Sequence, residues 1–183
     1  TLRPALQALP LALETLWDPV EPARLLEFLS HPIGPIHGQA RRLLAEAFAK
    51  QPGIGGQTWA NARERIAVEL GAEVIEHVAF WLETERSPRG TGAPLEQAMS
   101  RVTRLREALQ TRMGSLQQEG GKEDLLRDVA GSIGQCTQLL EGLQELRAEG
   151  IATVRPRLLE QLTTHATVDS GNTLAIAEVG CMQ

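Results

Sequence analysis

Phosphate-binding chemistry is the first possibility that the sequence raises, in the glycine-rich stretch PGIGGQT at residues 52–58. A nucleotide-binding loop requires a glycine-rich turn that ends in Lys followed by Ser or Thr, because backbone amides and the ammonium group together surround the phosphates. No lysine follows the glycines in this stretch. We therefore expect no ATP hydrolysis by this chain alone.

The Ser, His and Cys residues do not form a catalytic or metal-binding pattern. Ser30-His31 and the Thr-His pair at 164–165 lack the nucleophile elbow and the oxyanion signature of hydrolases. Cys136 and Cys181 have no Cys or His neighbour at metal-ligand spacing, which favours structural thiols in a reducing compartment. The pattern therefore predicts no catalytic residue, no metal site and no bound cofactor within these residues.

The other titratable side chains also favour structural or surface roles. We expect His77 to be partly buried and hydrogen-bonded rather than a metal ligand, because it stands in a helical pattern beside Val78. Acidic pairs at loop or helix ends favour solvent or the amino-terminal helix dipole. Surface positions are therefore predicted for Glu83, Glu85, Glu123 and Asp124.

The composition fits one helical domain. The 183 residues are 42% hydrophobic and 22% charged, which suffices for one sizeable core. Aromatic residues make up 3% and tyrosine is absent, so Leu, Ala, Ile and Val must fill a core of packed helices. No apolar run approaches the roughly 20 residues that span a bilayer, so we expect a soluble, cytoplasmic chain with no membrane partner. The net charge of −5 means that any DNA contact must be local.

Apolar residues at three- and four-residue spacing predict the helices of the first half. The expected elements are a helix over 5–17, a short helix opened by Glu21-Pro22, a helix over 39–50, and a long helix with inward positions from Ile66 to Trp81. The turn-rich segments HPIGPIHG at 31–38 and RSPRGTGAP at 86–94 are expected to be connections.

The second half predicts a long antiparallel helix hairpin over residues 95–148, because two apolar repeats are joined by the short turn EGGK. Pro156 is placed to begin a last helix. Residues 173–179 alternate as a strand does, but no other segment offers them a partner. The expected fold is therefore a mostly α, irregular helical domain over residues 1–183 with one C-terminal strand, cut from a larger protein that supplies the rest of the sheet.

The segment FAKQPGIGGQTWANA, residues 48–62, resembles a helix-hairpin-helix DNA-binding element. In that element a Gly-apolar-Gly turn exposes successive amides to a backbone phosphate, and the apolar residue anchors the turn. The candidate DNA-binding residues are Arg41, Arg42, Lys50, Gly53, Ile54, Gly55 and Gly56. The departure from the element is Trp59, where a small residue usually lets the helices approach. A glycine-rich turn that only joins two helices is the alternative interpretation.

The order of segments over nearly the whole chain is similar to the middle of an AddB-type helicase–nuclease subunit, within the UvrD-like helicases. The segments that carry the resemblance are residues 6–36, QPGIGG with Trp59, and WLETERSPRGTGAPLEQ at 81–97. The resemblance implies the inserted accessory domain called 2B. It also implies a parent protein that uses ATP, Mg²⁺ and an iron–sulfur cluster in double-strand break repair. None of that catalytic equipment falls in these residues, and the two cysteines do not match the cluster ligands.

Two functions remain open from the sequence. The first is a non-catalytic accessory domain of a DNA helicase/exonuclease subunit, which contacts the DNA backbone, the partner helicase–nuclease subunit or the remaining domains of the same chain. The alternative is a helical protein–protein interaction module without nucleic-acid contact, whose hairpin presents Arg101, Arg104 and Arg112 to a partner. A small-molecule enzyme would need a convergent polar pocket, of which the sequence has no sign.

Overall fold

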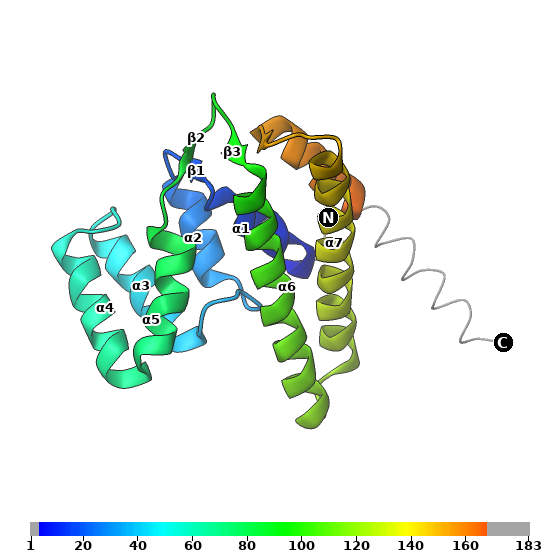
Figure 1. Cartoon of the computed structure of the whole chain (residues 1–183). Helices are drawn as coiled ribbons and strands as arrows, with labels where there is room; N and C mark the ends of the chain where they lie inside the picture. The colour runs from blue at the N-terminus through cyan, green and yellow to red at the C-terminus, as the bar shows by residue number, and fades with distance from the viewer. Residues whose placement is uncertain (1–3, 168–183) are drawn as a thin grey trace.

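The computed structural model describes residues 4–167, which form a predominantly helical fold (Figure 1). The helical segments are Pro4–Gln7 (η1, 3-10), Ala8–Glu14 (α1), Pro22–Ser30 (α2), Gly38–Lys50 (α3), Gln57–Leu70 (α4), Ala72–Val78 (α5), Ala79–Glu83 (η2, a π-helix), Leu95–Gln118 (α6) and Glu123–Ala148 (α7). A further helix is described over residues 156–167. The predicted mostly α class is confirmed. The predicted strand at 173–179 lies outside the described residues, as does Cys181.

The first helix is shorter than the predicted span of 5–17. The 3-10 helix η1 leads into α1, which ends at Glu14, where the Thr15 hydroxyl donates a 2.7 Å hydrogen bond to the Ala12 carbonyl. Pro10 lies in the first turn of α1, where its missing amide has no intrahelical partner to lose. Trp17 is buried beyond the end of this helix, in a short strand.

The predicted hairpin is present, because α6 and α7 lie side by side and run antiparallel (Figure 1). Buried residues at helical spacing form the seam: Leu105, Leu109, Leu116, Val129, Cys136, Leu140 and Leu143. The turn requires glycine at position 121, where a Cβ would lie 2.9 Å from the backbone oxygen of Leu116. The Gly121 amide donates to that same oxygen at 2.7 Å. Close backbone approach therefore sets this turn.

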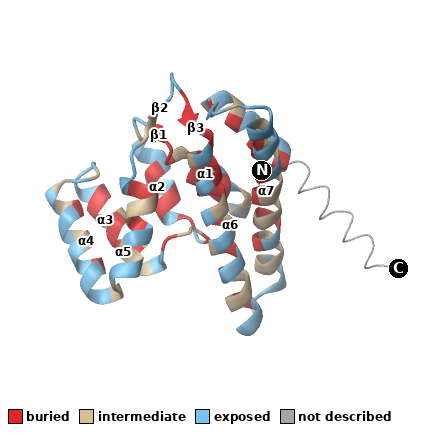
Figure 2. Ribbon diagram, viewed as in Figure 1, coloured by how far each residue is buried: buried red, intermediate tan, exposed pale blue. Residues whose placement is uncertain are grey.

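The α2 helix lies between two groups of helices (Figure 1). On one side α3, α4 and α5 pack together, and on the other side α1 packs against α6 while η1 packs against α7. Figure 2 shows the buried residues along the faces that these helices turn towards one another. One apolar cluster includes residues from both groups, so the candidate turn between α3 and α4 belongs to the same packed structure as the hairpin.

Residues 57–83 form three helical segments instead of the one long helix that the apolar spacing predicts. The break occurs at Gly71, whose φ of +93° is outside the range of a right-handed helix and is accessible to glycine. The α5 helix then continues directly into η2. Ile66, Val78 and Trp81 are buried on both sides of the break, so their spacing does not reveal it.

The 86–94 connection, predicted as a loop, contributes two short strands. The pairs are Trp17–Asp18 (β1) with Ser87–Pro88 (β2), parallel, and Ala93–Pro94 (β3) with Thr153–Val154 (β4), antiparallel. Strands of two residues are too short to show the period-two alternation by which strands are predicted. Gly92 permits the β3–β4 approach, because its φ is +85° and a Cβ there would lie 2.8 Å from the Val154 oxygen.

Candidate nucleic-acid interface

The turn between α3 and α4 exposes its backbone. Gly53 and Gly55 have φ values of +140° and +98°, and a Cβ built at either position would meet no heavy atom within 4 Å. Ile54 is half-buried and packs against the apolar core, so it anchors the turn as predicted. Lys50 is exposed in the last turn of α3. Gly53 and Gly55 are both exposed, so the backbone of the turn is accessible at these two positions.

The amino terminus of α4 faces the same turn. Gly56 stands at its N-cap and supplies no side-chain hydrogen bond, and the first turn contains no acidic residue. The polar side chains here bond to one another instead: Gln57 Nε2 donates to Asn61 Oδ1 at 2.8 Å, and Thr58 Oγ1 donates to Gln51 Oε1 at 2.8 Å. The first amides of a helix have no intrahelical acceptor and carry partial positive charge, which favours an anion.

Arg41 does not reach this turn. Its Nη1 donates a short hydrogen bond to the His31 carbonyl, and its Nη2 lies 3.5 Å from the Pro32 carbonyl oxygen. Burial lowers the pKa of Arg41, and the nearby positive charge of Arg112 lowers it further. Arg41 therefore fastens the connection between α2 and α3 to the start of α3, and its contact with DNA stays a prediction.

Arg42 lies at the same end of α3 as Arg41, next to an exposed carboxylate. Its guanidinium is 3.9 Å from Glu46, and both side chains are largely exposed. Nine residues of helix separate Arg41 from Lys50, which corresponds to about 14 Å along the axis. The predicted residues therefore fall into two groups, and only Lys50 and the four turn residues 53–56 lie together.

Trp59 is buried and connects α4 to η2. Its indole Nε1 donates a 3.0 Å hydrogen bond to Glu83 Oε1, and Arg63 Nε lies 2.8 Å from the same oxygen. Glu83 is an exposed residue, as predicted, and its carboxylate also accepts these two contacts. The α3 and α4 helices pack directly against each other with the large Trp59 side chain buried.

The sequence also predicted whether five other titratable residues are buried or exposed. His77 is exposed, which corrects the prediction that it is partly buried. Glu85, Glu123 and Asp124 are exposed as predicted. Cys136 is buried in the hairpin seam, and burial raises the pKa of its thiol to about 12, consistent with a structural role.

Arg101 is not on the outer face of the hairpin, where the protein-interaction hypothesis placed it. It is only 2% exposed, and its Nη1 donates to the carbonyl oxygens of Phe80 and Trp81 at 2.9 and 3.0 Å. Its guanidinium carbon lies 5.1 and 5.4 Å from the centroids of those two rings. Burial, and after it the charge of Arg86, lowers the pKa of Arg101 to about 10. No sequence spacing indicates this contact, because a charged residue in a helix is normally expected to face solvent.

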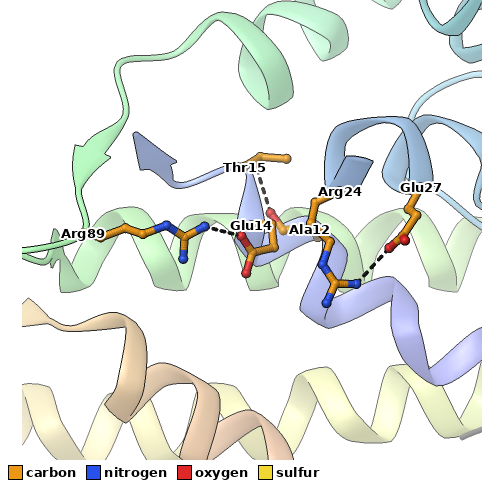
Figure 3. Close-up of polar contacts among 6 residues, drawn as sticks. All are labelled: Ala12, Glu14, Thr15, Arg24, Glu27 and Arg89. Carbon is orange, nitrogen blue, oxygen red and sulfur yellow. Dashed lines mark hydrogen bonds and ion pairs between the residues drawn. The ribbon is translucent and has the colours of Figure 1, made fainter. Parts of the chain in front are cut away.

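A groove of about 280 Å³ lies between α1, the start of α2 and the helix over residues 156–167. At its edge Arg89 contacts Glu14 at 2.5 Å, and Arg24 contacts Glu27 at 2.8 Å (Figure 3). Each of these four side chains is therefore in an ion pair, so none of the four is left as an unpaired acid or base at the groove. The Glu14–Arg89 contact joins residues 75 positions apart and has no signature in the sequence.

The described residues, 4–167, also bear on metal binding and membrane insertion. This part of the chain brings no three His, Cys, Asp or Glu side chains together as a metal-binding group. None of its helices combines the length and apolar character needed to cross a bilayer. No protein-family model, no curated protein and no solved structure matches the chain.

Proposed function

We propose that this chain is a non-catalytic accessory domain of a DNA helicase–nuclease subunit, and that the α3–α4 turn binds a phosphate of the DNA backbone. The observation that carries the proposal is the open turn itself. Two exposed glycines with positive φ lead into the uncapped start of α4, and the exposed Lys50 ends the preceding helix. Backbone amides at a helix start are a common phosphate-binding arrangement.

The local charge supports the proposal. Lys50 and Arg63 are the only charged residues between Glu46 and Glu64, so no carboxylate within that segment repels a phosphate. Five basic and three acidic side chains lie between residues 38 and 70, a local net charge of +2 in a chain of −5. A local positive region lets an acidic protein contact a polyanion through a few phosphates only.

The setting of this domain in a larger protein rests on the resemblance to AddB-type subunits. In that setting ATP, Mg²⁺ and an iron–sulfur cluster belong to other parts of the parent protein, which acts with a partner subunit on broken DNA ends. The contribution of this chain is then to hold or guide the DNA backbone while other domains do the chemistry. Its affinity alone should be low and sensitive to salt.

Fluorescence anisotropy with forked and blunt DNA tests the site. Lys50→Glu should weaken binding by about tenfold at low salt, because one attractive charge becomes repulsive next to the phosphate. The matched control is Lys122→Glu, which makes the same charge change at the other exposed lysine of the chain, at the start of α7. Equal loss in the two variants would show that only bulk charge matters, and no loss in either would remove the proposed site.

The alternative proposal is a protein-interaction module that does not contact nucleic acid. It now depends on Arg104 and Arg112, which are exposed on α6, since Arg101 is buried. Co-purification with a partner helicase subunit in the absence of DNA, lost on replacing these two arginines, would favour it. Association that survives their replacement would discard it.

A further inference from the structure

The arginines of α6 form no ion pair with a carboxylate, whereas most other arginines of the described chain do. Ion pairs with Glu or Asp are formed by Arg24, Arg42, Arg63, Arg65, Arg89, Arg127 and Arg147. Within residues 4–167 no such pair is formed by Arg101, Arg104, Arg106 or Arg112, all of which lie on α6. The two acidic residues of α6 do not compensate them, because Glu96 pairs with Arg147 and Glu107 is beyond ion-pair distance.

Three of these arginines share one face of α6, because spacings of three and eight residues return to the same side of a helix. Arg101 is used internally, as a donor to the carbonyls of η2. Arg104 and Arg112 are exposed. The guanidinium of Arg104 lies 5.0 Å from the ring centroid of Phe80, so the ring supports it from below and leaves its outer side to solvent.

The start of α3 contributes a further positive charge to this region. Figure 1 shows the connection between α2 and α3 running towards α6 and back. Arg41 stands at the end of that connection, close enough to Arg112 for the two charges to repel. Neither forms an ion pair with a carboxylate of the described chain. The Arg41 guanidinium donates to backbone carbonyls, so its contribution to this region is the positive charge that it adds next to Arg112.

We propose that Arg104 and Arg112 form a second surface that binds the phosphate backbone of a nucleic-acid strand, separate from the α3–α4 turn. Arg104 and Arg112 are eight residues apart, about 12 Å along the helix. One phosphate does not reach both, but phosphates of one strand do. The guanidinium group suits this role because it can donate two parallel hydrogen bonds to phosphate oxygens.

A nucleic-acid strand fits this face better than an acidic protein does. Specific protein interfaces surround an apolar centre with polar residues. The exposed large apolar residue of the described chain is Val68, which lies on α4, and Phe80 on the proposed face is already covered by Arg104. A strand needs no apolar centre, since it repeats a charge at every nucleotide and binds largely by releasing counterions.

The test is binding of a fluorescein-labelled single-stranded oligonucleotide over a range of salt concentrations. Arg104→Gln/Arg112→Gln should raise Kd at least about fivefold at low salt. It should also reduce the slope of log K against log salt by about 1.4, because each phosphate contact to a single strand contributes roughly 0.7. The matched control, Arg24→Gln/Arg147→Gln, removes the same charge from exposed arginines that already have carboxylate partners, and its Kd should stay within about twofold.

The outcomes separate this surface from its rivals. An unchanged slope in the Arg104/Arg112 variant overturns the proposal, as does an equal loss in the control, which would reflect net charge alone. Loss of polyglutamate binding with unchanged oligonucleotide binding also overturns it, in favour of an acidic protein partner. The turn site shares no residue with this surface. In a Lys50 variant, replacing Arg104 and Arg112 should therefore still reduce the slope of log K against log salt by the same amount. This holds whether or not the turn itself binds DNA.

Discussion

The Arg101 side chain of α6 donates a 2.9 Å hydrogen bond to the backbone carbonyl of Phe80 in η2. Carbonyl groups at the end of a helical segment lack amide partners, and a π-helix alters the regular pairing further. Arg101 satisfies two of these carbonyls, while the Thr84 hydroxyl donates to the Phe80 carbonyl at 2.7 Å. The hairpin is thereby joined to the helices that carry the α3–α4 turn.

Replacing Arg101 with Met should lower the free energy of unfolding by about 2–4 kcal/mol, because buried carbonyl groups lose a charged donor. The control Arg147→Met removes only an exposed pair with Glu96 and should cost less than about 1 kcal/mol. Urea unfolding followed by circular dichroism measures both. Similar losses in the two variants would show that the Arg101 contact is not a major link.

Glycine substitutions in the hairpin should have opposite signs. Gly121→Ala brings a methyl group within 2.9 Å of the Leu116 backbone oxygen and should destabilise the fold by about 1–3 kcal/mol. Gly114→Ala, inside α6, meets no atom within 4 Å and should stabilise by about 0.5–1 kcal/mol. Thermal unfolding of the two variants gives the comparison. A stabilising Gly121→Ala would contradict the close approach described for the turn.

The buried thiol of Cys136 should make stability decrease at alkaline pH. Burial raises its pKa from 9.0 to about 12, so above pH 9 the unfolded chain loses a proton that the folded chain retains. The unfolded state then binds fewer protons, and stability falls as pH rises towards 12. Between about pH 8.5 and pH 10 the wild type should lose about 1 kcal/mol more than Cys136→Ala.

The comparison with Cys136→Ala also removes the contribution of Arg101. Its lowered pKa of about 10 acts in the opposite direction at higher pH, and both proteins contain it. Urea unfolding at the two pH values supplies the four free energies. Equal pH dependence in wild type and variant would mean that the thiol is hydrated in the folded protein.

Gln57→Glu should separate folding from binding at the candidate turn. A carboxylate in the first turn of α4 favours the helix dipole, so stability should rise by about 0.3–1 kcal/mol. The same carboxylate would occupy the place of a phosphate and should reduce DNA affinity by about tenfold. Anisotropy and thermal unfolding on the same sample test both effects. Unchanged affinity in the stabilised variant would remove the phosphate from the start of α4.

Local periodicity accounts for what could be predicted of the fold. The hairpin follows from apolar spacing around a glycine turn, and Pro22 and Pro156 begin helices as their fixed φ favours. The break at Gly71 was missed because the apolar stripe continues on both sides of it. The β1–β2 and β3–β4 pairs were missed because two-residue strands depend on partners far away in the sequence.

The candidate sites show the same limit. The glycine turn and Lys50 are neighbours in the chain, so their grouping was visible in the sequence. The role of Arg41 depends on the carbonyls of a preceding connection, and that of Arg101 on η2, some twenty residues before it. Side-chain partners of that kind follow from tertiary packing, which spacing along one helix does not report.

The most direct test of the phosphate-binding turn is an amide nitrogen–proton correlation spectrum of ¹⁵N-glycine-labelled protein, recorded while a short DNA duplex is added. If the turn binds phosphate, the amides of Gly55 and Gly56 shift most, with smaller changes at Gly53. Gly90, Gly114 and Gly150, which lie in other parts of the fold, should stay in place. Shifts at those distant glycines without any at residues 53–56 would contradict phosphate binding at the α3–α4 turn.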